Sequence, residues 1–192
     1  MRARQIPAGT PPVPRPAGAP RGFLRDRRGV VAIEFAMLAP VTVLLLFGGF
    51  EATRMVRASV RLNDVAQTVA DLVAQQTAIT AVGMSNICTG GGIVMTPLPT
   101  AGLDATVASV TYSSASSSRV LDWQDTTCGN GAAIASPTAL AQPYLPNVKD
   151  SVIVVQAVYP YTPIVATLLS KSFTMTRTAY ARPRNGSSVS HY

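Results

Sequence analysis

A single carboxylate, that of Glu34, interrupts an otherwise apolar run from Val30 to Phe50, in which Thr42 is the only other polar side chain. Glu34 is the fifth residue after Gly29. A cut between Gly29 and Val30 would therefore place a new α-amine one helical turn from this carboxylate, at positions i and i+4. An ammonium and a carboxylate at that spacing can neutralise each other, within one helix or between neighbouring helices.

Glu34 also has a simpler interpretation. It lies about one turn inside the end of the run, where a carboxylate reaches the membrane surface. It then costs less than the roughly 2.5–3.5 kcal/mol of an acid at the centre of a span. Both interpretations stay open at this level: a tolerated interfacial acid, or the counter-charge of an N-terminal amine.

The apolar run itself has the length of a membrane span, since the 21 residues from 30 to 50 rise about 1.5 Å each as a helix. Five arginines occupy the 15 residues before it and three the 20 after it, which predicts a cytoplasmic N-terminus. The core is too long for a secretory signal peptide, and EATRMVR follows it in place of a small-x-small cleavage site. The residues around Arg27-Arg28 do not fit a twin-arginine signal.

The chain's basic character belongs to its first residues. Seven arginines and one aspartate give residues 1–29 a net charge of +6, out of +7 for the whole chain, and six prolines stand among them. This composition predicts a disordered basic cytoplasmic leader over 1–29. A nucleic-acid-binding surface would need basic residues clustered on a folded domain, so we expect no nucleic-acid partner.

Residues 51–82 are predicted to continue the transmembrane helix of residues 30–50 as an amphipathic extension. Apolar residues recur there at spacings of three and four, which indicates one apolar stripe; they are Met55, Ala58, Leu62, Val65, Val69 and Leu72. The stripe is expected to pack on the protein's own globular domain, with a partner helix as the alternative.

Residues 83–182 are predicted to form a small periplasmic α+β domain, and residues 183–192 a disordered tail. Four segments have strand character: 105–114, 118–125, 150–161 and 172–182. A short helix or loop is expected at 163–170. The predicted fold class is α+β, a long N-terminal helix packed on a small antiparallel β-sheet.

Chemistry beyond the N-terminus is sparse. Cys88 and Cys128 are the only cysteines, both expected in glycine-bearing loops, and a disulfide between them is predicted for an oxidising compartment; two separate thiols are the alternative. The only histidine, His191, lies in the tail, which argues against a zinc site and a Ser-His-Asp arrangement. Gly90-Gly91-Gly92 lacks the lysine of a phosphate loop. We therefore expect no metal, no cofactor and no enzymatic activity.

The start of the apolar run resembles the processing site of type IV pilins and pseudopilins. In those families a membrane aspartyl peptidase cleaves after a glycine preceded by basic residues, and a glutamate stands fifth in the mature chain. The matching residues are Arg27, Arg28, Gly29, Val30 and Glu34.

The wider stretch, over about residues 25–75, resembles the N-terminal segment of TadE-like proteins of the tight-adherence (Tad) pilus system. The shared features are the Glu34-Phe35-Ala36 step, Pro40, the leucine run and the Gly49-Phe50-Glu51 exit. A weaker similarity returns in VIVVQAVYPYTPIVATLL. The major Tad pilin is much shorter and has tyrosine after its glutamate, whereas this chain has Phe35. A larger Tad family member carries a D-x-S-x-S metal-binding domain that this chain lacks.

The resemblance implies a minor pseudopilin that takes part in Tad pilus assembly or initiation, and so in surface adhesion. It would be cleaved between Gly29 and Val30 by a prepilin peptidase, with Arg27, Arg28, Glu34 and Phe35 in processing and assembly recognition. Its other partners would be Tad pilus subunits, the inner-membrane assembly platform and membrane lipid. It would be a single-pass protein of the bacterial inner membrane, with incorporation into the pilus as a further option. The alternative is a permanently anchored periplasmic binding module that is never processed.

Overall fold

The computed structural model describes residues 29–164 and 172–192. The chain divides into two compact units, Met1–Leu44 and Leu45–Tyr192. Most of the predicted leader, with Arg27 and Arg28, lies outside the described residues, and so does most of the segment expected to be a helix or loop at 163–170.

Helix α1 covers Val30–Ala74 as one element of 45 residues, with Pro40 inside it. It is long and apolar enough to cross a membrane, and the apolar window that meets this test is exposed throughout. Beyond Phe50 one face of α1 becomes buried. Its most buried side chains there are Ala58, Leu62, Val65, Ala66, Val69, Ala70, Val73 and Ala74. They form a common core with strands of the second unit. The predicted apolar stripe of α1 therefore packs on the protein's own sheet.

The predicted end of α1 near residue 82 is wrong. The helix ends at Ala74 and is followed by strand β1, Ala78–Ile79, and by a second helix, α2, over Ala81–Val94. The β-branched residues Thr77 and Ile79 favour extended backbone. Thr80 then caps α2, since its side chain accepts a hydrogen bond from the Gly83 N–H at 3.2 Å.

The glycine-rich stretch is therefore helical, and the prediction that Cys88 lies in a loop is also wrong. A Cβ atom at Gly91 would lie 2.8 Å from Val69 Cγ2. The missing side chain lets α2 approach α1 closely, which outweighs the low helix propensity of glycine.

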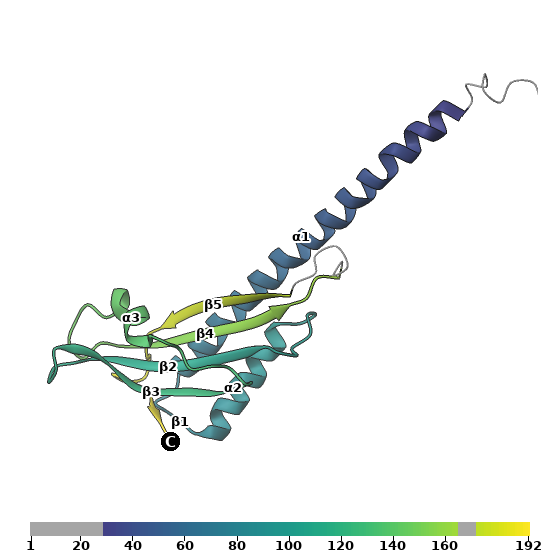
Figure 1. Cartoon of the computed structure of the whole chain (residues 1–192). Helices are drawn as coiled ribbons and strands as arrows, with labels where there is room; N and C mark the ends of the chain where they lie inside the picture. The colour runs from purple at the N-terminus through teal and green to yellow at the C-terminus, as the bar shows by residue number, and fades with distance from the viewer. Residues whose placement is uncertain (1–28, 165–171) are drawn as a thin grey trace, which may run out of the picture. The chain divides into compact units, whose positions relative to one another are not determined.

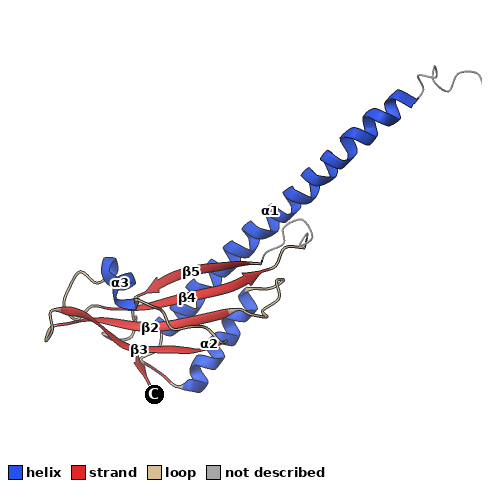
Figure 2. Cartoon of the chain, viewed as in Figure 1, coloured by secondary structure: helices blue, strands red, loops and turns tan. Residues whose placement is uncertain are grey.

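The predicted antiparallel sheet is confirmed. Its strands are β2, Asp104–Ser113, β3, Ser118–Cys128, β4, Ser151–Tyr161, and β5, Phe173–Ala181. They lie in the order β3-β2-β4-β5, and every neighbouring pair is antiparallel (Figures 1 and 2). The fold class is α+β.

Each face of the sheet carries its own core. Side chains such as Val107, Ile153 and Val155 pack with α1 and α2. Their neighbours along the strands point to the opposite face. There Val110, Val154 and others pack with a short helix that the sequence patterns missed, α3, Pro137–Ala141, which a 3₁₀ turn, Gln142–Tyr144, follows.

The C-terminal residues 183–192 are ordered, so the predicted disordered tail is wrong. Strand β6, Ser190–His191, pairs in parallel with β1. Val189 is 1% exposed, and its carbonyl accepts a hydrogen bond from Trp123 Nε1 at 2.6 Å. One buried apolar side chain and several polar contacts hold the tail, and no local pattern in a serine-rich stretch signals them.

Candidate functional site

The exposed N-terminal end of α1 carries the predicted processing residues. Apart from its chain neighbours, no heavy atom of the described residues lies within 4 Å of the position that a Cβ atom at Gly29 would take. Val30 is 48% exposed and Phe35 is 71% exposed. Within the described part of the chain, the Gly29–Val30 bond is thus free of neighbouring side chains that would hinder a peptidase.

Val30 and Glu34 lie one turn apart at the very start of α1. Side chains in a helix lean toward its N-terminus, so the Glu34 carboxylate extends over the first turn. That turn contains no acidic residue of its own. An ammonium at a helix N-terminus is disfavoured by the helix dipole, so Glu34 is the residue on this helix that can offset a charge on a free Val30 amine.

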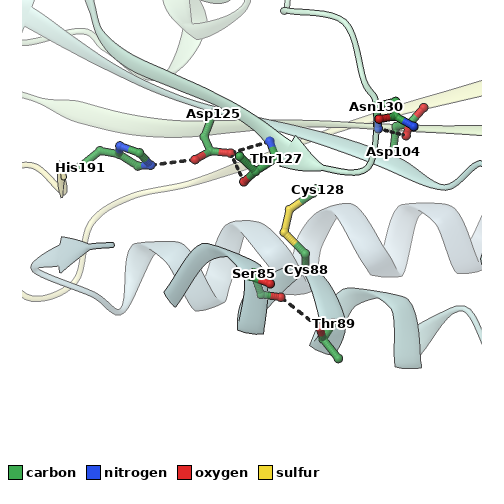
Figure 3. Close-up of a disulfide and its surroundings, with 9 residues drawn as sticks. All are labelled: Ser85, Cys88, Thr89, Asp104, Asp125, Thr127, Cys128, Asn130 and His191. Atoms are coloured by element: carbon green, nitrogen blue, oxygen red, sulfur yellow. Dashed lines mark hydrogen bonds and ion pairs between the residues drawn. A yellow bond between two sulfur atoms is a disulfide. The ribbon is translucent and has the colours of Figure 1, made fainter. Parts of the chain in front are cut away.

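The described site residues form two separate groups, one in each unit of the chain. Gly29, Val30, Glu34 and Phe35 follow one another at the start of α1, whereas Cys88 and Cys128 belong to the second unit. The cysteines form the predicted disulfide, with their Cα atoms 5.3 Å apart. Figure 3 shows the bond joining α2 to the end of β3.

Beside the disulfide, Asp125 is 5% exposed and accepts hydrogen bonds from Thr127 N at 2.7 Å and from His191 Nε2 at 2.7 Å (Figure 3). Burial acts to raise the pKa of Asp125, but these bonds and the nearby His191 outweigh it, and the pKa is lowered. The hydrogen bond between Asp125 and His191 joins the C-terminal residues to β3. Among the described residues, no three His, Cys, Asp or Glu side chains gather in a way that could hold a metal ion.

A second polar site lies where α1 leaves its apolar run, and the sequence patterns gave it no role. Glu51 is 3% exposed, and its carboxylate accepts hydrogen bonds from the Tyr161 hydroxyl and, at 3.2 Å, from the Ile164 N–H. Burial first, and then the hydrogen bond to Glu51, raise the pKa of Tyr161 to about 12. Gly49-Phe50-Glu51, at the end of the apolar run, was the only sequence feature that marked this site. An acid after an apolar run is ordinarily a surface residue.

The Glu51 site ties the end of β4 to the first residue of α1 beyond Phe50. A buried carboxylate is stable only with hydrogen-bond partners or a counter-charge. Here both oxygens are used, one by a side chain and one by the backbone. The sheet is thus attached to α1 at the point where the apolar segment ends.

Removing the disulfide is expected to destabilise the second unit. A bridge across a sequence separation of 40 residues contributes about 4 kcal/mol in the chain-entropy treatment, and 2–4 kcal/mol is typical. Cys88→Ala with Cys128→Ala should therefore lower the urea midpoint of the full chain in non-ionic detergent. The chain's single tryptophan, Trp123, reports the transition by its fluorescence.

Reduced wild-type protein is the control for this pair and should unfold near the midpoint of the double variant. On non-reducing gels the oxidised monomer should run faster than the reduced one. Efficient alkylation of both thiols in natively prepared protein, without reductant, would contradict the prediction.

Comparison with known families bears on the N-terminal part of the chain. Residues 29–71 match the family model of TadE-like proteins. No curated protein and no solved structure matches the chain. TadE-like proteins are a structural family associated with pili. The match runs from the glycine before α1 into the buried half of that helix, the same part of the chain whose sequence resembles TadE-like proteins.

Proposed function

We propose that the chain is a non-enzymatic minor pseudopilin that is cleaved between Gly29 and Val30 by a prepilin peptidase and then takes part in assembling or initiating a Tad pilus. The observation that carries the proposal is the start of α1. No described side chain obstructs the Gly29–Val30 bond. One turn later stands the only acid of an exposed apolar helix segment.

The residues on both sides of the bond have distinct roles in this proposal. Arg27 and Arg28 supply positive charge before the cleavage position, and Gly29 supplies a residue without a side chain. After cleavage the Glu34 carboxylate neutralises the new amine of Val30. Phe35, exposed next to Glu34, is available to neighbouring helices.

The segment from Val30 to Phe50 anchors the protein in the bacterial inner membrane, with the N-terminus cytoplasmic and the sheet domain periplasmic. Other Tad subunits and the assembly platform are the partners, and the pilus mediates adhesion. The arginine bias around the span and the disulfide between Cys88 and Cys128 support this orientation, since disulfides persist in oxidising compartments.

The protein isolated from its own cells is expected to begin at Val30. Gly29→Leu should leave the uncut form, because a bulky side chain obstructs the peptidase's cleavage position. Intact mass and N-terminal sequencing measure both outcomes, in cells with and without the prepilin peptidase.

Gly48→Leu is the matched control, since Gly48 lies on the helix that follows Gly29 and, like Gly29, has no neighbour within 4 Å among the described residues. It should be processed normally. Wild-type protein that retains Met1 in peptidase-positive cells would remove the proposal and leave the permanently anchored periplasmic module.

A further inference from the structure

Three arginines follow the apolar segment on one flank of α1. Arg54, Arg57 and Arg61 stand at positions i, i+3 and i+7, which are neighbours on a helix surface. At 1.5 Å per residue they lie about 6, 10 and 16 Å beyond Phe50. The headgroup layer of a bilayer extends roughly 5–8 Å beyond the hydrocarbon on each side. Long arginine side chains reach back toward it.

None of these arginines forms an ion pair within residues 29–164 and 172–192. Arg182 and Arg184, farther along the chain, do pair, with Asp150 and Asp71.

The Glu51 carboxylate does not pair with these arginines. It accepts hydrogen bonds from the Tyr161 hydroxyl and the Ile164 N–H instead. The Nη1 atom of Arg54 is buried without a hydrogen-bond partner among the described residues. The arginines next to the apolar segment therefore have no carboxylate partner among the described residues.

One end of the sheet lies beside the part of α1 that directly follows the apolar segment. Glu51 contacts Tyr161, and Ser59 contacts Arg177. The helix rises about 12 Å over those eight residues. Tyr161 pairs with Phe173, and Arg177 lies four residues farther along β5, a distance of about 13 Å. The strands therefore run alongside α1, with the end of β4 and the start of β5 near Glu51.

Two apolar side chains are exposed at that end of the sheet. Ile164 is 65% exposed and Phe173 is 41% exposed. Apolar and aromatic side chains of this kind are stabilised at the boundary between headgroups and acyl chains.

We propose that Arg54, Arg57, Arg61, Ile164 and Phe173 form a lipid-contact surface that binds anionic phospholipid. The arginines bind the headgroup phosphates, and the two apolar residues enter the boundary layer. The inference rests on the part of the proposed function in which Val30–Phe50 spans the membrane. It does not depend on cleavage after Gly29 or on which side of the membrane the domain lies.

The test uses the full chain in lipid nanodiscs that contain spin-labelled phosphatidylglycerol or phosphatidylcholine. Electron spin resonance gives the relative association of each lipid with the protein. Wild-type protein should prefer phosphatidylglycerol. Arg57→Gln with Arg61→Gln should reduce the preference by about fivefold per arginine, the effect of one basic residue near an anionic surface. Rising salt should weaken the wild-type preference.

The matched control, Arg182→Gln with Arg184→Gln, removes the same charge elsewhere on the second unit and should keep the preference. For the apolar residues, Phe173→Trp should gain a fluorescence component that brominated phospholipid quenches, beyond the signal of Trp123 in the wild type.

Equal association of the two lipids with wild-type protein would overturn the proposal. So would an equal loss in both double variants, which would indicate net charge alone. The Arg57 and Arg61 variant could keep the lipid preference and yet be defective in pilus assembly. That result would show that the three arginines bind an acidic protein partner instead of lipid. Uncut protein that still prefers phosphatidylglycerol would refute the processing proposal and leave this one standing.

Discussion

Glu34→Gln is expected to abolish surface piliation while the protein still inserts and is still cleaved. Glutamine has nearly the shape of glutamate but no charge, and a neutral amide costs less in a membrane than a carboxylate. Membrane abundance should therefore stay at the wild-type level or rise. Pilus assembly should fail, because the ammonium of Val30 loses its counter-charge where the dielectric constant is low and charge pairing is strongest.

The measurement is surface piliation, together with membrane abundance and the N-terminal residue of the variant. Asp64→Asn is the matched control, since it makes the same carboxylate-to-amide change on α1 beyond the apolar segment. This variant should be piliated. Normal piliation of Glu34→Gln at normal abundance would show that Glu34 is only a tolerated interfacial acid.

The fold could be predicted where the sequence shows a recognisable pattern of apolar residues. The α1 stripe buries side chains at spacings of three and four, and the strand at 151–161 is buried along most of its length. The apolar run is recognised by its length and composition instead, since none of its apolar window is buried. The true end of α1 has no such pattern. No proline or glycine stands between Glu51 and Val82 to mark it. The helix stops because Gln75, Gln76 and Thr77 lead into a strand that pairs with residues more than 100 positions away.

The residues of the candidate site also differ in whether the sequence alone predicts them. The proposed roles of Gly29 and Glu34 depend on their spacing along the chain, so the sequence alone predicts these residues. The Glu51 site consists of contacts across 110 and 113 residues, and the tail contacts Trp123 across 66. Such pairings exist only once the sheet has formed, and a glutamate, a tyrosine and a serine-rich tail give no local sign of them.

Glu51→Ala is expected to lower the free energy of unfolding by about 1–3 kcal/mol, the cost of one unsatisfied buried group. The change leaves the buried Tyr161 hydroxyl without its acceptor. The Ile164 N–H loses the same acceptor, but Ile164 is exposed, so water can replace the carboxylate there. Urea unfolding of the full chain in non-ionic detergent, followed by Trp123 fluorescence, gives the value. Glu34→Ala is the matched control, because Glu34 is the chain's only other glutamate and is exposed on the same helix. It should leave the midpoint unchanged.

A double-mutant cycle with Tyr161→Phe separates this hydrogen bond from a general loss of packing. If Glu51 and Tyr161 act together, the double variant should lose less stability than the two single variants combined, by about 1 kcal/mol or more. Additive losses in the cycle would show that the carboxylate stabilises the helix independently of the tyrosine.

The pH dependence of stability offers an independent check on the Glu51 site. Because the pKa of Tyr161 is raised to about 12 in the folded protein and lies near 10 in an unfolded chain, the neutral hydroxyl stabilises the fold fully below pH 10. That contribution is lost as the pH rises from about 10 to 12, since a phenolate would face the Glu51 carboxylate. Two pKa units correspond to at most about 3 kcal/mol. Tyr161→Phe should remove this part of the alkaline loss and leave the part due to Tyr159 and Tyr180, whose pKa values burial also raises. An unchanged alkaline profile in Tyr161→Phe would mean that its hydroxyl does not donate to a buried carboxylate.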